Sequence, residues 1–321
     1  MRCARIHELG ADLVLEEIAQ PEPGPGEVLV RVAACGVNFA DTLTVKGQYQ
    51  EKPALPFAPG MEIAGEVVAH GAGVSAPAIG QAVAGMAGQG GFAEYAVLPA
   101  SACLPVPPSM PMRDAAAFLI AYGTSHVALD HRAHLRPGER LLVLGAAGGV
   151  GLTAVEIGKL MGAEVIACAR GAEKLAIAKS KGADHLIDSA SDDIRDSVKA
   201  LGGADVVYDP VGGDQFMAAL RACNPEARLL PLGFASGQIP QIPANLLLVK
   251  NLTVIGLYWG AYLRIDPKVL TTSFATLFGW YVEGKLKPHV SHELPLDRAG
   301  EALELLTSRK ATGKVVVLPG G

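Results

Sequence analysis

The segment LLVLGAAGGVG, from Leu141 to Gly151, constrains the fold of this chain more than any other stretch. A short apolar run, expected as a buried strand at Leu141–Leu144, breaks into glycines and then resumes as a helical pattern. Gly145, Gly148 and Gly151 recur at every third position, and glycine permits a tight turn and a close approach of the backbone to a ligand. The N–H groups that open the next helix attract phosphate. The segment therefore predicts a dinucleotide-binding turn, with a purely structural glycine turn as the alternative.

Beyond this turn the chain alternates between apolar strand-like runs and helical patterns. The further expected strands are Glu164–Cys168, His185–Ile187, Asp205–Tyr208, Arg228–Leu232 and Thr253–Leu257. The expected helices are Gly149–Met161, Glu173–Lys181 and Gln215–Cys223. Alternation of this kind is typical of parallel βαβ units, so we predict an α/β fold with a doubly wound parallel sheet.

The two ends of the chain have a different character. Strand-like segments at Glu27–Ala33 and Met61–Ala69, separated by Pro and Gly, predict a β-rich region before the glycine turn. Arg113–His131 reads as a helix. The tail carries a predicted helix at Asp297–Ser308 and a closing strand at Lys314–Leu318.

Composition excludes several classes of protein. The 321 residues suffice for two domains, half of them are hydrophobic, and the net charge of −5 with no basic cluster argues against nucleic-acid binding. No apolar run approaches the roughly 20 residues that cross a bilayer, and no signal peptide is evident. The five cysteines are scattered and form no CxxC pair, which argues against disulfides and zinc knuckles. We expect no nucleic-acid or membrane partner and a reducing, cytoplasmic location.

The residue that ends the second strand of a dinucleotide fold distinguishes NAD from NADP. Here that strand ends at Ala169 and Arg170 without an acid, and Lys174 follows in the next helix. A basic pair at this place accommodates a 2′-phosphate and predicts NADPH. The alternatives are a solvated pair at a helix start and, for Glu173, ordinary complementation of the helix dipole.

Nine motifs distributed along the chain resemble the zinc-free quinone oxidoreductase branch of the medium-chain dehydrogenase/reductase superfamily. They are PEPGPGEVLVRV, ACGVNFAD, GMEIAGEV, GQGGFAEY, AYGTSHVAL, LGAAGGVG, VVYDPVGGD, GFASG and KATGKVVV. The resemblance implies a GroES-like catalytic domain at 1–120, a Rossmann NADP-binding domain at 121–265, and a return segment of the catalytic domain at 266–321. It also implies an active site in the cleft between the domains and a homodimer joined through edge strands near Leu252–Leu257.

The same motifs bear on metal binding. The zinc-dependent alcohol dehydrogenases of this superfamily place a Cys ligand where this chain has Asn38 and a His ligand where it has Met61. Neither residue is a thiolate or imidazole ligand of the kind that catalytic zinc requires. No Cys lies between Gly85 and Ser101, where a structural zinc lobe would be expected. We expect no metal, and we expect Cys35 to be a small buried thiol.

The resemblance also implies roles for individual residues, each with a structural alternative. Asn38 is expected near the nicotinamide or the acceptor oxygen, or else as a turn residue that bonds to backbone. Tyr49 is expected over the active site, orienting a carbonyl or relaying a proton, or else as a rim residue packed on Pro-rich loops. Thr124 is expected at the nicotinamide end, or else bonded back to its own helical turn. Asp41 and Glu62 are expected to be structural.

The remaining cofactor-binding candidates lie at the carboxyl ends of predicted strands, where open α/β sheets bind ligands, or near the C-terminus. They are Gly148, Gly149, Val150, Gly151, Arg170, Lys174, Gly212, Gly233, Phe234, Ala235 and Lys314. Ser189 stands where relatives often carry a tyrosine beside the 2′-phosphate, which weakens the NADP assignment. The aromatic group Tyr258, Trp259 and Tyr262 either covers the acceptor pocket or packs at the domain junction. His126, His131 and His134 are read as solvent-facing or helix-terminal.

These expectations combine into an NADPH-dependent, metal-free oxidoreductase. It would transfer hydride to a small-molecule acceptor, a quinone or an α,β-unsaturated carbonyl compound, which already carries its own electron sink. The alternatives are an enoyl-thioester reductase of the enoyl-CoA type and a non-enzymatic, crystallin-like protein that binds NADPH. The sequence does not identify the physiological acceptor or decide whether Tyr49 donates a proton.

Overall fold

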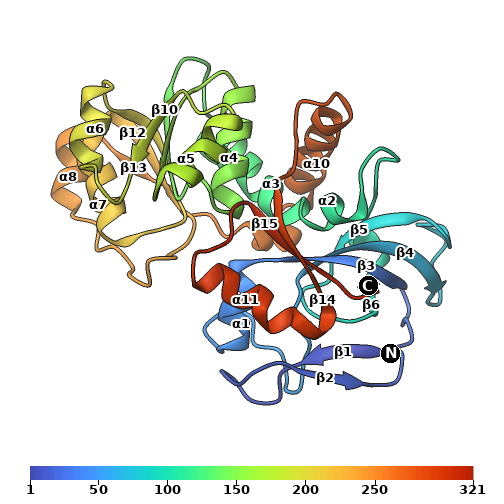
Figure 1. The fold of residues 1–321 in the computed structure, drawn as a ribbon. Coiled ribbons are helices and arrows are strands. Elements are labelled where there is room, and N and C mark those ends of the chain that lie inside the picture. Colours follow the sequence, from blue (N-terminus) through green and yellow to red (C-terminus); the bar gives the residue numbers. More distant parts are fainter. Residues whose placement is uncertain (321) are drawn as a thin grey trace. The chain divides into compact units, whose positions relative to one another are not determined.

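The chain folds into two compact units (Figure 1). The computed structural model describes residues 1–320. The first unit comprises Met1–Ile120 and the segment that begins at Pro288, and the second comprises Ala121–Lys287. The return segment was expected to begin at residue 266. It begins later because helix α10 (Pro267–Val282) packs within the second unit, where the ring of Phe274 meets that of Trp259 edge-on at 6.1 Å.

An antiparallel-rich sheet organises the first unit. Its strands are β3 (Glu27–Val37), β4 (Glu62–His70), β5 (Ala82–Met86), β6 (Tyr95–Pro99), β7 (Cys103–Pro105), β14 (Val290–Pro295) and β15 (Lys314–Leu318). They pair in the order β14-β15-β3-β4-β5-β7, and β6 pairs with β3. Because β15 lies antiparallel to β3, the C-terminal strand completes a sheet whose longest strand lies near the N-terminus.

Smaller elements cover this sheet. They are a hairpin of β1 (Arg2–Arg5) and β2 (Val14–Glu17), the helices α1 (Phe39–Val45), α2 (Met112–Ala116) and α11 (Ala299–Thr307), and the short turns η1 (Ala100–Ala102) and η4 (Leu296–Arg298). Val28, Val30 and Val32 of β3 are buried in one cluster with Ile63 and Val315. Their spacing of two residues is that of a strand that turns one face to the core.

A six-stranded sheet organises the second unit. Its strands are β8 (Arg140–Leu144), β9 (Glu164–Ala169), β10 (His185–Asp188), β11 (Ala204–Asp209), β12 (Cys223–Pro231) and β13 (Thr253–Val254). All pairs are parallel, and the order is β10-β9-β8-β11-β12-β13. The order reverses beside β8, which is the strand that leads into the glycine turn. Open α/β sheets bind their ligands at such a reversal.

Helices alternate with these strands. They are α3 (Leu119–His126), α4 (Gly149–Leu160), α5 (Ala172–Ser180), α6 (Ile194–Ala200), α7 (Gly213–Ala222), α8 (Ala244–Lys250), the short α9 (Tyr262–Ile265) after η3 (Trp259–Ala261), and α10. A π-helical segment, η2 (Val127–Arg132), continues α3. Of these helices α3 begins in the first unit and continues into the second.

Neighbouring residues of β8 face opposite helical layers. Leu142 lies in a buried cluster with Val207 of β11 and Phe216 of α7. Leu141 faces α4, since a Cβ added to Gly158 of α4 would lie 2.4 Å from its Cδ2 atom. Helices therefore cover both faces, and the predicted doubly wound α/β architecture is confirmed.

Three sequence-based expectations differ from the structure. The helix expected at Arg113–His131 is divided into α2, α3 and the π-helical segment η2. The strand expected at Thr253–Leu257 is limited to Thr253–Val254. Helix α10 was not expected, although Asp266 caps its N-terminus and Pro267 occupies its first turn, a recognised start signal.

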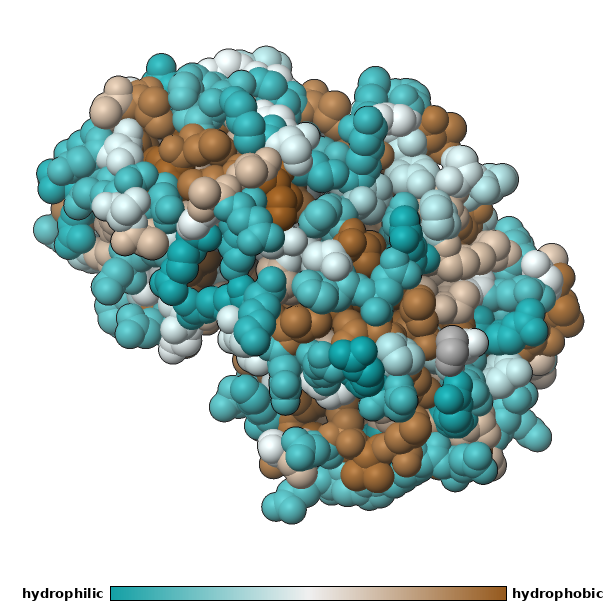
Figure 2. Space-filling model, in the orientation of Figure 1, coloured by the Kyte–Doolittle hydropathy of each residue, from teal (hydrophilic) through white to brown (hydrophobic). Residues whose placement is uncertain are grey.

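Hydrophilic side chains cover much of the surface seen in Figure 2, and apolar side chains form separate patches on it. Within residues 1–320 no helix has the length and apolar character to cross a bilayer.

Candidate functional site

The glycine turn between β8 and α4 brings the backbone close to the start of a helix. Gly145 has a φ of +61°, and the N–H of Gly148 donates to its carbonyl oxygen at 2.9 Å. A Cβ on Gly151 would lie 2.2 Å from that same oxygen. Any side chain at this position would therefore force the helix away from the turn.

The N-terminus of α4 is suited to an anion. Gly148 is the N-cap residue and has no side chain to cap the N–H groups of the first turn, which Gly149, Val150 and Gly151 form. The helix is 12 residues long, so its dipole adds positive potential at this end. This helix end can accommodate a pyrophosphate, because its glycines leave space that a Cβ atom would fill.

Three buried hydroxyl groups fix α3 against this turn. The Ser125 hydroxyl of α3 donates to the Val150 carbonyl at 2.9 Å and lies 2.8 Å from both Thr153 Oγ1 and the Tyr208 hydroxyl. Burial raises the pKa of Tyr208, so this hydroxyl stays protonated and serves as a hydrogen-bonding group. The adjacent Thr124 is half-buried. Its helix is thus held at a defined position relative to the glycine turn.

The end of β9 leads to the basic residues that are predicted to accommodate the 2′-phosphate of NADPH. Arg170 is exposed and Lys174 is half-buried in the first turn of α5. Asp188, at the end of the neighbouring strand β10, accepts N–H groups from Gly171 at 3.0 Å and Ala190 at 2.9 Å. These two bonds, with the Arg170 charge in support, lower the pKa of Asp188.

Sequence reasoning did not weigh Asp188. Its position directly after the strand predicted at His185–Ile187 was the available signal, and in the structure it is the last residue of that strand. The carboxylate shapes the loop that carries Arg170. Ser189, which follows it, is half-buried, and its N–H donates to the carbonyl of Ala169 at 3.0 Å.

The loops after β11 and β12 are tied to each other. The N–H of Ala235 donates to the carbonyl of Pro210, and the N–H of Gly213 donates to the carbonyl of Gln238. Gly212 has a φ of +72°, and Gly233 is half-buried. Phe234 is 39% exposed, so its ring is available to a ligand at this edge of the sheet.

Asp209 closes the base of these loops. Its carboxylate is fully buried and accepts N–H groups from Val211 at 2.7 Å and Gly212 at 2.9 Å. Burial raises the pKa of Asp209 to about 6, although the two backbone donors oppose the rise.

In the first unit, Asn38 and Lys314 meet in a buried polar cluster. The Lys314 ammonium donates to Asn38 Oδ1 and to Glu62 Oε1, both at 2.7 Å. Asn38 Nδ2 donates to Glu62 Oε1 at 2.9 Å and to the Gly36 carbonyl at 3.3 Å. Both amide hydrogens of Asn38 therefore have acceptors inside the protein.

Glu62 and Asp41 extend this cluster to the backbone. The Glu62 carboxylate is fully buried, and its Oε2 accepts the N–H of Ile120 at 2.9 Å, in the first turn of α3. Asp41 accepts the N–H groups of Asn38 and Gly60, at 2.8 and 3.0 Å. Burial raises the pKa of Asp41 to about 6, with these donors opposing. The bonds agree with the structural roles expected for both acids.

Tyr49 and Cys35 complete the first-unit candidates. Tyr49 is half-buried in a bend that follows α1. Cys35 is fully buried, and burial raises the pKa of its thiol. Its sulfur is enclosed by two glycines, since a Cβ on Gly60 or Gly91 would lie 2.7 or 2.6 Å from it. A thiol in this setting is unreactive, as expected for a small core residue.

Two other residue groups lie in the second unit. Trp259 packs against Gly123 of α3, where a Cβ would lie 2.7 Å from its ring, and its buried Nε1 has no hydrogen-bond partner within residues 1–320. His126 is the last residue of α3, and it is buried, with Nδ1 at 2.9 Å from the Ser273 hydroxyl. Burial lowers the pKa of His126 and keeps the ring neutral.

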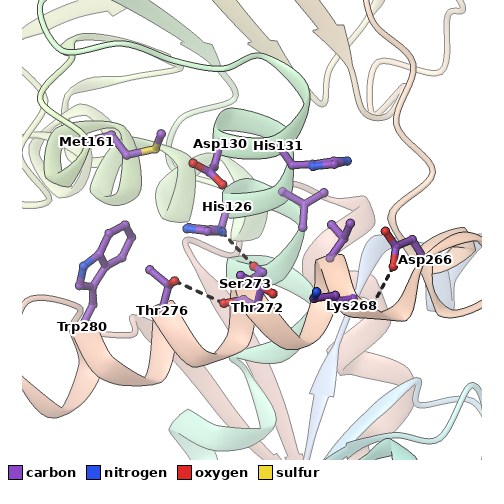
Figure 3. Close-up of a pocket in the computed structure, with 12 residues that line it drawn as sticks. His126, Asp130, His131, Met161, Asp266, Lys268, Thr272, Ser273, Thr276 and Trp280 are labelled. Carbon is purple, nitrogen blue, oxygen red and sulfur yellow. Dashed lines mark hydrogen bonds between the residues drawn. The ribbon is translucent and has the colours of Figure 1, made fainter.

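A hollow of about 410 Å³ opens beside His126 (Figure 3). Asp130 and Met161 lie on one side of it, and Lys268 and Trp280 of α10 lie on the other. None of the predicted catalytic or cofactor-binding residues lines it. Among residues 1–320, no cluster of three or more His, Cys, Asp and Glu side chains could hold a metal ion.

Comparisons with known proteins match both units. Residues 24–108 match the family model described as alcohol dehydrogenase GroES-like domain, and residues 149–275 match the model described as zinc-binding dehydrogenase. A quinone oxidoreductase-like protein 2 homolog from Nematostella vectensis is 45% identical, over 98% of this chain and 88% of that protein.

Solved structures agree with these matches. The quinone oxidoreductase of Thermus thermophilus, solved alone and with NADPH, is 34% identical with a TM-score of 0.88, over 99% of this chain and all of that one. The Escherichia coli quinone oxidoreductase in complex with NADPH is 28% identical with a TM-score of 0.92, over the same shares.

Proposed function

We propose that this protein is an NADPH-dependent oxidoreductase, because the chain belongs to the quinone oxidoreductase branch of the medium-chain dehydrogenase/reductase superfamily. Its acceptor is a quinone or an α,β-unsaturated carbonyl compound. The observation that carries the proposal is the glycine turn, in which Gly151 approaches Gly145 so closely that only a backbone without a side chain fits. Such a turn at the start of α4 leaves room and N–H groups for a pyrophosphate.

The residues of the second unit bind and orient the coenzyme. Gly149, Val150 and Gly151 offer backbone N–H groups to its pyrophosphate, and Gly148, whose own N–H is bonded to the Gly145 carbonyl, shapes the turn that holds it. Arg170 and Lys174 accommodate the 2′-phosphate, and Thr124 contacts the nicotinamide end. The loops at Gly212 and Gly233–Ala235 line its remaining length. Bound NADPH supplies a hydride from C4 of its nicotinamide.

The residues of the first unit receive the acceptor. Tyr49 donates its hydroxyl hydrogen to the acceptor carbonyl and so stabilises the negative charge that hydride transfer places there. Asn38 is part of the site wall, and its amide hydrogens are held by Glu62 and Gly36. A quinone or enone needs no Lewis acid, because conjugation delocalises the charge.

A homodimer is part of this proposal. Strand β13 lies at the edge of the second sheet and pairs only with β12 among the strands of residues 1–320. Beside it, helix α8 exposes Leu248 and Val249, whose side chains are 76% and 68% accessible. An open strand edge next to exposed aliphatic side chains is suited to pairing with a second copy. The buried, unpaired cysteines are consistent with the reducing cytoplasm as its location.

The test is a steady-state screen of NADPH and NADH against simple quinones, alkenals and enoyl thioesters. We expect NADPH oxidation with a quinone or an alkenal. Replacing Arg170 with Ala should raise the KM for NADPH about tenfold, the scale of a lost charge-assisted hydrogen bond, and leave that for NADH unchanged. Lys179→Ala, at an exposed position of α5, is the control. Turnover with enoyl thioesters alone would favour an enoyl-thioester reductase, and inactivity with every acceptor would contradict the proposal.

A further inference from the structure

The side chains of the polar cluster formed by Asn38, Glu62 and Lys314 do not fit a divalent cation, and they lie outside residues 149–275, the segment that matches the family model described as zinc-binding dehydrogenase. Asn38 supplies an amide where zinc requires a thiolate, imidazole or carboxylate. The Lys314 ammonium lies 2.7 Å from both Asn38 Oδ1 and Glu62 Oε1. A divalent ion at these oxygens would be repelled by that fixed positive charge.

The geometry points to Lys314 as an internal cation that positions Asn38 and the segments that meet around Glu62. Lys314 opens β15, Asn38 caps α1, Glu62 opens β4, and Ile120 lies in the first turn of α3. The ammonium and the carboxylate that it neutralises thus join four segments that are far apart in the sequence. The inference rests on the proposed function, because two of its site residues flank α1 (Asn38 before it and Tyr49 after it) and Thr124 lies on α3.

Charge balance explains why the ammonium is needed. The side chains of Lys314 and Glu62 are 6% and 0% exposed, so neither charge is hydrated. A buried carboxylate that loses its partner is strongly destabilising, whereas replacing both charges by neutral groups is not. Removing Lys314 alone should therefore affect folding through Glu62.

Orientation is the second consequence. Asn38 accepts from Lys314 through Oδ1 and donates to Glu62 through Nδ2, so the two charged partners select one of the two amide orientations. Without these charges, only the Gly36 carbonyl, at 3.3 Å from Nδ2, would favour the same orientation. Replacing both charged side chains with neutral ones should therefore recover folding and leave the Asn38 amide less firmly oriented than in the wild type.

The experiment compares Lys314→Met, Glu62→Gln/Lys314→Met and the control Lys310→Met, in which an exposed lysine near the same strand is changed. Thermal unfolding, NADPH binding, kcat and the side-chain amide signals of Asn38 in ¹⁵N NMR are measured for each. We expect Lys314→Met to lose at least 10 °C in Tm and the double variant to regain most of it. The double variant should bind NADPH within threefold of the wild type, and its kcat should be at least tenfold lower.

Three outcomes would overturn the inference. They are a Tm for Lys314→Met equal to that of Lys310→Met, a double variant that regains no stability, and a double variant with wild-type kcat and an unchanged Asn38 amide signal. Failure of the proposed function has a different signature. The wild type would then turn over no acceptor, and the Tm cycle and the Asn38 signal would still decide the role of Lys314.

Discussion

Gly151 is the residue on which nucleotide binding depends most directly. A Cβ at this position would lie 2.2 Å from the Gly145 oxygen, a backbone atom that cannot move without opening the turn. We predict that Gly151→Ala raises the dissociation constant for NADPH at least tenfold, with a loss of about 1–3 kcal/mol in stability from overpacking. Fluorescence titration below the unfolding temperature measures the first effect, and urea unfolding measures the second.

Gly300→Ala is the matched control, because a Cβ on this helical glycine meets nothing within 4 Å. It should keep wild-type affinity and gain a few tenths of a kcal/mol in stability from helix propensity, on the order given by host–guest scales. Unchanged NADPH affinity in Gly151→Ala would show that the turn does not bind the coenzyme.

Asp209 gives the second unit a defined dependence of stability on pH. Burial raises its folded pKa to about 6 from the ordinary 3.8. The folded protein thus holds this proton more tightly than the unfolded chain does. The stability contributed by the group is present below pH 3.8 and is lost as the pH rises through about 6.

Asp209→Asn should remove this dependence, because an amide oxygen still accepts the N–H groups of Val211 and Gly212. Between pH 5 and 7.5 (roughly the range of the titration) we predict that the variant loses about 1 kcal/mol less unfolding free energy than the wild type. Urea unfolding at both pH values checks this. The control Asp214→Asn, at an exposed position, should show the same pH dependence of stability as the wild type. If Asp209→Asn also shows the wild-type pH dependence, Asp209 does not ionise in this pH range.

Among the helices and strands, α3 and α4 are held on β11 by the cluster of buried hydroxyl groups. We predict that Ser125→Ala costs about 1–3 kcal/mol of unfolding free energy, since the Tyr208 hydroxyl, hydrogen-bonded at 2.8 Å, would be buried without this partner. Adding Tyr208→Phe removes the orphaned group and should recover most of the loss. Urea unfolding of both single variants and the double variant measures the coupling, and simple additivity would show that the two hydroxyl groups do not interact.

At this scale the sequence predicted what depends on local pattern. The strand Lys314–Leu318 was predicted to the residue, and the glycine turn with its flanking strand and helix is confirmed, because apolar periodicity and glycine spacing are local signals. Helix α10 was not predicted because its Thr, Phe, Trp and Tyr residues have modest helix propensity. Its packing onto Trp259 and His126 stabilises it instead.

The polar cluster of the first unit could not be predicted as a cluster. Lys314 and Glu62 are separated by 252 positions, and they meet because β15 pairs with β3, which in turn pairs with β4. Such pairings between distant strands leave no short-range signal. Sequence reasoning therefore found Asn38, Glu62 and Lys314 one by one and assigned Lys314 to the cofactor, whereas its ammonium is bonded to the other two.

At the scale of the whole molecule, the open edge at β13 and the aliphatic residues of α8 predict self-association. Leu248→Glu/Val249→Lys should raise the dimer dissociation constant at least 100-fold, because charges would replace apolar contacts at the interface. Light scattering after gel filtration measures the mass in solution. Ile79→Glu, at a 63% exposed apolar residue of the first unit, should stay dimeric. A monomeric wild type would refute the interface.

We propose that this protein passes hydride from NADPH to a conjugated acceptor without help from a metal ion. The most direct test gives chelator-treated protein NADPH deuterated at C4, on the side from which hydride is transferred, together with an enone, and analyses the product by mass spectrometry. We predict one deuterium at the β-carbon of the product and a kcat equal to that of untreated protein. Product without deuterium, or turnover that stops with chelation and returns with Zn²⁺, would contradict it.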